Sequence, residues 1–163
     1  MYADLIDELD RQISRQSWVE VSAAWTNLNL MLADTWHAVD TINYNVNLYI
    51  FANALNKSPA GALFWAVTVV NSQQDTPNVR LAVGSNASCV WWVNGQKVAG
   101  IYGDHQTVAD DGVSKRLTLK KGPNVSRCAT INGSGATDFC GRFLDADDKP
   151  VTNLALSLGE TAH

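Results

Sequence analysis

The alternation of apolar and polar residues predicts an all-β protein. From residue 41 onward, short runs rich in aromatic and β-branched residues are separated by Gly-, Asn- and Pro-containing segments, which is typical of β-strands joined by turns. The chain shows no βαβ alternation and no internal repeat of about 20–50 residues. We therefore expect an antiparallel β-sandwich of the jelly-roll type. The predicted strands are 42–50, 62–70, 79–83, 89–93, 96–99, 115–119, 125–131, 137–144 and 151–158.

Two hairpins are expected within this pattern. Asn94-Gly95 separates two extended runs, and a type I′ turn needs positive φ at both central residues, so this dipeptide is a strong hairpin signal. A second hairpin is predicted between 125–131 and 137–144, with a three-residue loop. In that register Cys128 faces Cys140, which makes the two a candidate disulfide, the alternative being two reduced thiols side by side. A shift of one residue would remove the pairing.

The N-terminal segment follows a different pattern. Leu5, Ile6, Leu9 and Ile13 recur at a helical spacing, which predicts a helix over residues 3–16. The alternative is a linker or docking helix outside the main domain. We divide the chain into an N-terminal helical extension or linker, residues 1–20, and a β-sandwich module, residues 21–163.

Composition and charge exclude several classes of protein. The chain has 163 residues, of which 46% are hydrophobic and 17% charged, too apolar for a disordered chain. With 12 basic against 16 acidic residues the formal net charge is −4, so no nucleic-acid partner is expected. No apolar run approaches the roughly 18 residues of a membrane span. The acid-rich N-terminus lacks the apolar region of a signal peptide.

Segments between residues 79 and 158 resemble a known family. Residues 79–86 (VRLAVGSN) and 90–98 (VWWVNGQKV) resemble a strand-and-turn pattern of galactose-binding-domain-like jelly rolls. Residues 117–124 (LTLKKGPN) and 139–145 (FCGRFLD) are similar to two further segments of that pattern. Where the family pattern often has Asp-Asp, this chain has Asn86-Ala87.

The resemblance implies a module attached to a secreted carbohydrate-active enzyme. The implied ligand is a polysaccharide or oligosaccharide, and the implied neighbour is the catalytic domain of the same parent chain. The implied location is extracellular or periplasmic. A similar fold is weak evidence for a similar function, so the site residues are considered from their own chemistry.

Signatures of catalysis are absent from the sequence. It contains no GxSxG, HExxH, P-loop or GxGxxG motif. A glycosidase needs two carboxylates flanking the scissile bond, and such a pair would come from Asp104, Asp110, Asp111 and Asp138. Our leading hypothesis is a non-catalytic carbohydrate-binding module. The alternatives are a structural or protein-interaction module and, third, a small hydrolase.

Aromatic and polar residues supply the candidate sugar site. Pyranose rings stack on aromatic side chains, and their hydroxyls pair with carboxylates and amides. One of Trp91 and Trp92 should point inward and the other outward or toward a second layer, because neighbouring strand residues alternate faces. For each aromatic ring, burial in the core is the competing interpretation. The candidate substrate-binding residues are Trp36, Trp91, Trp92, Tyr102, Asp104, His105 and Gln106.

Two further polar groups are candidates. Asn43, Asn45 and Asn47 line one face of the first predicted strand, and this face meets either a glycan or water. Asp145, Asp147 and Asp148 cluster in a short loop. Calcium prefers several oxygen ligands, so this cluster is a candidate structural calcium site, a plain acidic turn being the alternative. No cofactor is required for the proposed binding.

Overall fold

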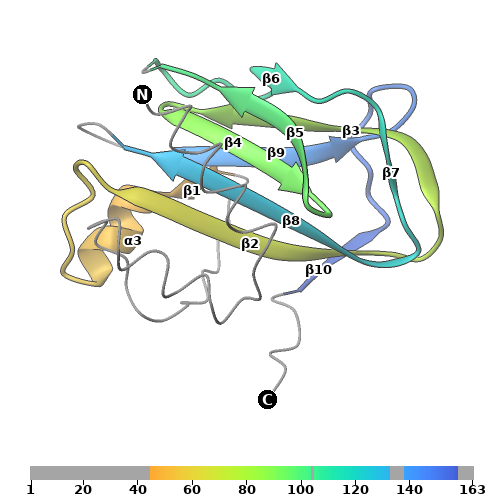
Figure 1. Ribbon diagram of the computed structural model, residues 1–163, viewed down its shortest axis with the longest axis horizontal. Helices are drawn as coiled ribbons and strands as arrows, with labels where there is room; N and C mark the ends of the chain where they lie inside the picture. Colours follow the sequence, from red (N-terminus) through yellow and green to blue (C-terminus); the bar gives the residue numbers. More distant parts are fainter. Residues whose placement is uncertain (1–44, 104, 133–137, 158–163) are drawn as a thin grey trace.

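The computed structural model describes residues 45–103, 105–132 and 138–157, and these residues form two five-stranded antiparallel sheets (Figure 1). Sheet A has the order β1–β9–β3–β6, with β7 also paired to β3, and sheet B has the order β10–β2–β8–β4–β5. The predicted all-β sandwich is confirmed. The helix expected over residues 3–16 and the boundary at residue 20 lie outside the described residues. The strands are β1 (Asn45–Asn47), β2 (Leu63–Ser72), β3 (Thr76–Ser85), β4 (Ser88–Val93), β5 (Gln96–Ile101), β6 (Gly112–Val113), β7 (Leu117–Leu119), β8 (Gly122–Ile131), β9 (Asp138–Leu144) and β10 (Leu154–Ser157).

Strand β8 organises sheet B. It pairs with β2 over the whole length of both strands and with β4 on its other side. Because side chains alternate along a strand, one face of each of these strands enters the core between the sheets. Residues of sheet A fill the same core from the opposite side. The residues that meet there include Cys89, Trp91, Val93 and Cys128 from sheet B, and Leu81, Val83, Phe139 and Phe143 from sheet A.

The expected strand 42–50 is wrong beyond residue 47. β1 ends at Asn47, and helix α3 (Leu48–Ala54) follows it directly. The Asn47 side chain caps this helix by accepting a hydrogen bond of 2.9 Å from the backbone N–H of Ile50, as Asn commonly does at this position. Leu48 and Ala52, four residues apart, form its buried side. No helix in the described ranges is long and apolar enough to span a membrane.

The two predicted hairpins have opposite outcomes. The Asn94-Gly95 turn is confirmed: both residues have positive φ, 51° and 80°, and β4 pairs with β5. The hairpin predicted over 125–144 is wrong, because β8 belongs to sheet B and β9 to sheet A. The chain therefore crosses between the layers, and the pairing with distant strands overrides the local turn signal.

This crossing separates the predicted disulfide partners. Cys128 faces the core and lies opposite Ala66 and Trp91. Cys140 lies opposite Gly84, on the outer face of sheet A, because its neighbour Phe139 is the core-facing residue. All three cysteines are free and buried. Packed sheets are about 10 Å apart, beyond the Cα separation that a disulfide tolerates, so the predicted Cys128–Cys140 bridge is not formed.

A buried asparagine joins two turns at one end of the sandwich. Asn124, only 1% exposed, accepts hydrogen bonds of 2.9 Å from both the Asn94 side-chain amide and the Lys120 backbone N–H. Its own amide donates to the carbonyl oxygens of Lys120 and Gly122 at 2.8 and 3.1 Å. The LKKGPN segment therefore ends on a residue that satisfies the backbone of its own turn and binds the Asn94 side chain of the neighbouring hairpin.

We expect Asn124→Ala to lower the free energy of unfolding by roughly 2–4 kcal/mol, because it leaves several buried polar groups without partners. Urea denaturation measures the change. Asn71→Ala is the matched control, since the Asn71 side chain makes an exposed hydrogen bond to Ser157, and it should change stability by less than about 0.5 kcal/mol. Equal losses in the two variants would contradict this role for Asn124.

We also expect a thiol reagent to titrate all three cysteines after denaturation but to react slowly with the native protein. Burial raises the pKa of the Cys128 thiol well above its ordinary value, and burial is also the main cause of the raised pKa of Cys140. A raised pKa means less reactive thiolate at pH 8. The pKa of Cys89 is instead lowered, chiefly by its hydrogen bond with Cys128, so the slow reaction expected there rests on its 0% exposure. A single thiol in the unreduced, denatured chain would instead reveal a disulfide.

Candidate functional site

The outer face of sheet A carries a loop that follows β5. The described residues of this β5–β6 loop are 102–103 and 105–111. The loop approaches β3 so closely at Gly84 that a Cβ atom there would lie 2.2 Å from the Val108 carbonyl oxygen. Farther along, the Asp110 carboxylate pairs with the Arg142 guanidinium on β9. Glycine at position 84 therefore permits the loop to lie against the sheet.

A polar pocket of about 380 Å³ lies where this loop meets β1, β9 and the β3–β4 turn. Asp138, the first residue of β9, is its centre. Its carboxylate accepts hydrogen bonds of 2.6 Å from the Asn45 side-chain amide and 2.5 Å from the Thr107 hydroxyl. Its backbone N–H donates to the Asn86 side-chain oxygen at 2.9 Å. The pocket is lined by Asn45, Asn86, His105, Gln106, Thr107 and Asp138.

The Asp138 carboxylate is held by neutral donors. The His105 imidazole pairs with Asp111, 3.0 Å between Nε2 and Oδ2. The pKa of the neighbouring Cys140 thiol is raised, first by burial and then by the negative charges of Asp110 and Asp138. Hydrogen-bond donors rather than cations thus fix the carboxylate.

One acceptor in the pocket has no donor among the described residues. The side-chain oxygen of Asn45 is buried and accepts no hydrogen bond, while its amide nitrogen is used by Asp138. A buried polar atom without a partner carries a free-energy penalty of about 1–3 kcal/mol.

The structure brings only part of the predicted sugar site together. His105 and Gln106 line the pocket. Tyr102 lies three residues before His105 in the same loop and is 53% exposed, with its ring over Gly100. Trp36 and Asp104 lie outside the described residues.

Trp91 and Trp92 point to opposite faces of sheet B as expected, and of the alternatives left open for their rings the structure shows burial for both. Trp91 lies between the sheets, edge-on to Phe139 with 5.7 Å between ring centroids. Trp92 points to the opposite face of sheet B, as alternation requires, but it is only 1% exposed and packs beside Trp65 at 5.5 Å. The outward tryptophan is therefore buried although it points away from the core between the sheets.

Sequence reasoning did not connect the four residues that complete the pocket. Asn45, Asn86, Thr107 and Asp138 lie in four separate parts of the chain. Two signals were visible: the alternating Asn residues of the first predicted strand, and Asn86 at the position where the family pattern has an acid. Only strand pairing, Asn45 next to β9 and β9 next to β3, brings them together.

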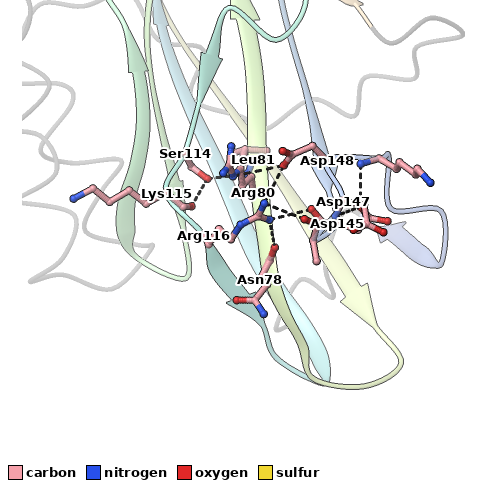
Figure 2. Close-up of polar contacts among 11 residues, drawn as sticks. Asn78, Arg80, Leu81, Ser114, Lys115, Arg116, Asp145, Asp147 and Asp148 are labelled. Atoms are coloured by element: carbon pink, nitrogen blue, oxygen red, sulfur yellow. Dashed lines mark hydrogen bonds and ion pairs between the residues drawn. The ribbon is translucent and has the colours of Figure 1, made fainter.

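The acidic turn 145–149, which holds the candidate calcium residues, is bound by its own backbone and by Arg116 (Figure 2). The Asp145 carboxylate accepts from the backbone N–H groups of Asp147 and Lys149, each at 2.9 Å. The Asp148 carboxylate lies 3.3 Å from the Arg116 guanidinium, which also donates to the Asp145 carbonyl oxygen. In the part of the chain that the structure describes, no group of three or more acidic, histidine or cysteine side chains is arranged to hold a metal ion.

Comparison with known proteins gives distant structural likenesses. No protein-family model and no curated protein matches the chain. The selenomethionine-labelled β-glucosidase of Kluyveromyces marxianus is similar, with 22% identity, a TM-score of 0.48, and coverage of 68% of this chain and 14% of that chain. The same enzyme in complex with glucose gives a TM-score of 0.44 with the same identity and coverage. The likeness therefore concerns a small part of that enzyme.

We expect Gly84→Ala to destabilise the protein by about 1–3 kcal/mol, because the added methyl group would overlap backbone atoms of the β5–β6 loop. Gly100→Ala is the matched control. A Cβ there would lie 3.0 Å from the Tyr102 hydroxyl oxygen and 3.2 Å from its ring, and this exposed side chain can swing away. Urea denaturation compares the two variants. If Gly100→Ala costs as much as Gly84→Ala, the close approach of the loop is not the constraint described above.

Proposed function

We propose that this chain is a non-catalytic carbohydrate-binding module and that saccharide hydroxyls bind at the Asp138 pocket. The observation that carries the proposal is the convergence of a carboxylate, amides, a hydroxyl and an imidazole on one small pocket. The unused Asn45 oxygen adds an acceptor without a donor. The pocket volume of about 380 Å³ lies within the usual range of ligand sites, about 300–1,000 Å³.

The pocket chemistry suits sugar hydroxyls because each hydroxyl both donates and accepts a hydrogen bond. Asp138 and the Asn45 oxygen supply acceptors, while Gln106 supplies both a donor and an acceptor. The bonds from Asn45 and Thr107 hold the Asp138 carboxylate in place before a ligand arrives. Preorganisation of this kind lowers the ordering cost of binding.

Tyr102 is the aromatic platform that we propose for this site. Its phenol ring is half exposed, and the loop that carries it also supplies His105, Gln106 and Thr107. A sugar ring resting on tyrosine gains contact area with its C–H face, and the phenol hydroxyl remains available for a hydrogen bond. The tryptophans of sheet B have no part in this proposal.

The carboxylates near the pocket are already bound to other side chains, which favours a binding role over hydrolysis. A glycosidase places two carboxyl groups about 5–10 Å apart across the scissile bond. Here Asp138 is held by Asn45 and Thr107, Asp110 pairs with Arg142, and Asp111 pairs with His105. Each of these carboxylates already has fixed partners, which supports a binding role.

A binding module of this kind acts through the protein to which it is attached. We propose a catalytic domain of the same parent chain as its neighbour and a polysaccharide or oligosaccharide outside the cytoplasm as its ligand. Tethering makes the enzyme's encounter with the polymer effectively intramolecular, which raises the local concentration without any new contact.

We expect the chain to be retarded in affinity gels by at least one polysaccharide identified on a glycan array. Asp138→Asn should weaken binding more than tenfold, because hydrogen bonds to a charged group contribute about 1.5–3 kcal/mol. Tyr102→Ala should weaken binding several-fold with little change in Tm. Leu156→Ala is the control, since Leu156 is exposed and on sheet B. Retention that survives both site variants, or hydrolysis of the polysaccharide by the wild-type chain, would refute the proposal.

A further inference from the structure

Sheet B is apolar on both of its faces. Strands β2, β8 and β4 lie side by side in this sheet (Figure 1). The face turned toward sheet A lines the core that the two sheets share. A sheet with one face in water normally alternates apolar and polar residues, whereas apolar residues on both faces indicate a sheet that is covered on both sides. The side chains on the face turned away from sheet A, here called the outer face of sheet B, include Leu63, Trp65, Val67, Val69, Val90, Trp92, Val125, Ala129 and Ile131.

The centre of this outer face is buried although it lies outside the core between the sheets. Val90 and Ala129 are 0% exposed and Trp92 is 1% exposed, yet none of the three belongs to the core cluster that joins the two sheets. Their neighbours on the strands, Cys89 and Trp91, do belong to it. Trp92 packs beside Trp65, and its 1% exposure on a face turned away from the core points to a further cover over the centre of this face.

We propose that residues 1–44 of the same chain dock on the outer face of sheet B. The length is sufficient: a helix over residues 3–16 would be about 21 Å long, and the residues between it and β1 can span more than 80 Å when extended. The apolar stripe of that predicted helix, with Trp18 and Trp25 after it, offers a surface of matching chemistry.

Charge complementarity points to the same occupant. Residues 1–44 contain seven acidic residues against two arginines, a formal charge of −5. Residues 45–163 contain nine acidic and ten basic residues, a formal charge of +1. Arg127 lies on the outer face, opposite Val67 and Trp92. An acidic segment with an apolar side therefore fits this surface.

The docking surface and the Asp138 pocket lie on opposite sides of the sandwich. The pocket opens on the outer face of sheet A, among β1, β9 and the β5–β6 loop. Docking on sheet B therefore leaves the pocket open. The inference is independent of the proposed sugar binding, and each can fail without the other.

Photocrosslinking in the full chain tests the proposal. The photoreactive amino acid p-benzoylphenylalanine would replace Val67, a half-buried residue on the outer face of sheet B. Val69, also half-buried on this face, provides a second position in case the first variant does not fold. Val113, a 46% exposed valine on the edge strand of sheet A, is the matched control. After irradiation, mass spectrometry of the digested monomer identifies the linked peptides, and circular dichroism checks the fold.

The proposal expects crosslinks from position 67 or 69 to peptides within residues 1–44, at least fivefold more abundant than from position 113. Covalent dimers that link the outer face of one chain to that of another would overturn it in favour of a second copy as occupant. Crosslinks confined to neighbouring strands would overturn it as well, since they would show that no other part of the chain covers this face.

Discussion

The pairing of β8 with both β2 and β4 is the constraint on which the rest of the structure depends. It runs over the whole of β2, from Leu63 opposite Ile131 to Ser72 opposite Gly122. Since side chains alternate strictly along a strand, this one register decides which residues enter the core. It places Trp91 against Phe139 between the sheets and sends Trp92 to the other side, beside Trp65. A slip of one residue would exchange the two faces.

The same constraint bears on why the proposed binding surface lies on sheet A. The centre of the outer face of sheet B, at Val90, Trp92 and Ala129, is apolar and buried, so it offers few groups that recognise a polar ligand. Sheet A differs at its outer face, where Arg142 and Asp138 lie on β9 and Asn45 lies on the adjacent strand. The glycine at position 84 then admits the β5–β6 loop, which adds His105, Gln106 and Thr107. A polar pocket arises where four segments meet, with a carboxylate fixed by neutral donors.

Local patterns in the sequence predicted much of the fold. The apolar runs at 62–70, 79–83 and 89–93 lie within β2, β3 and β4, and the Asn94-Gly95 turn follows from its own φ requirements. The errors arose where a choice depended on distant residues. Asn47 continues an alternating pattern but acts as a helix cap. The segments around Cys128 and Cys140 read as a hairpin, yet each pairs with strands of a different sheet.

The candidate site was predictable only in part for the same reason. His105 and Gln106 are close in sequence and stood out together as polar residues of a long loop. Asp138 was visible as one of several aspartates, and Asn45 as one of several alternating asparagines. Nothing local distinguishes them, because their significance comes from the pairing of β1 with β9. Likewise, alternation correctly separated Trp91 from Trp92, but it could not reveal that the outward ring is buried.

The contrast between the two outer faces argues for a division of roles within one sandwich. A polar face with a fixed carboxylate and an unused acceptor is suited to a ligand that exchanges with water. An apolar face with a fully buried indole is suited to a permanent covering, because leaving it bare would expose a large side chain to water at a cost of about 1.5–3 kcal/mol for each such residue. On the two proposals made above, the sandwich would be covered on the sheet B side and would present its ligand site on the sheet A side. Docking of residues 1–44 on sheet B would therefore place the covering layer on the side of the sandwich opposite the Asp138 pocket.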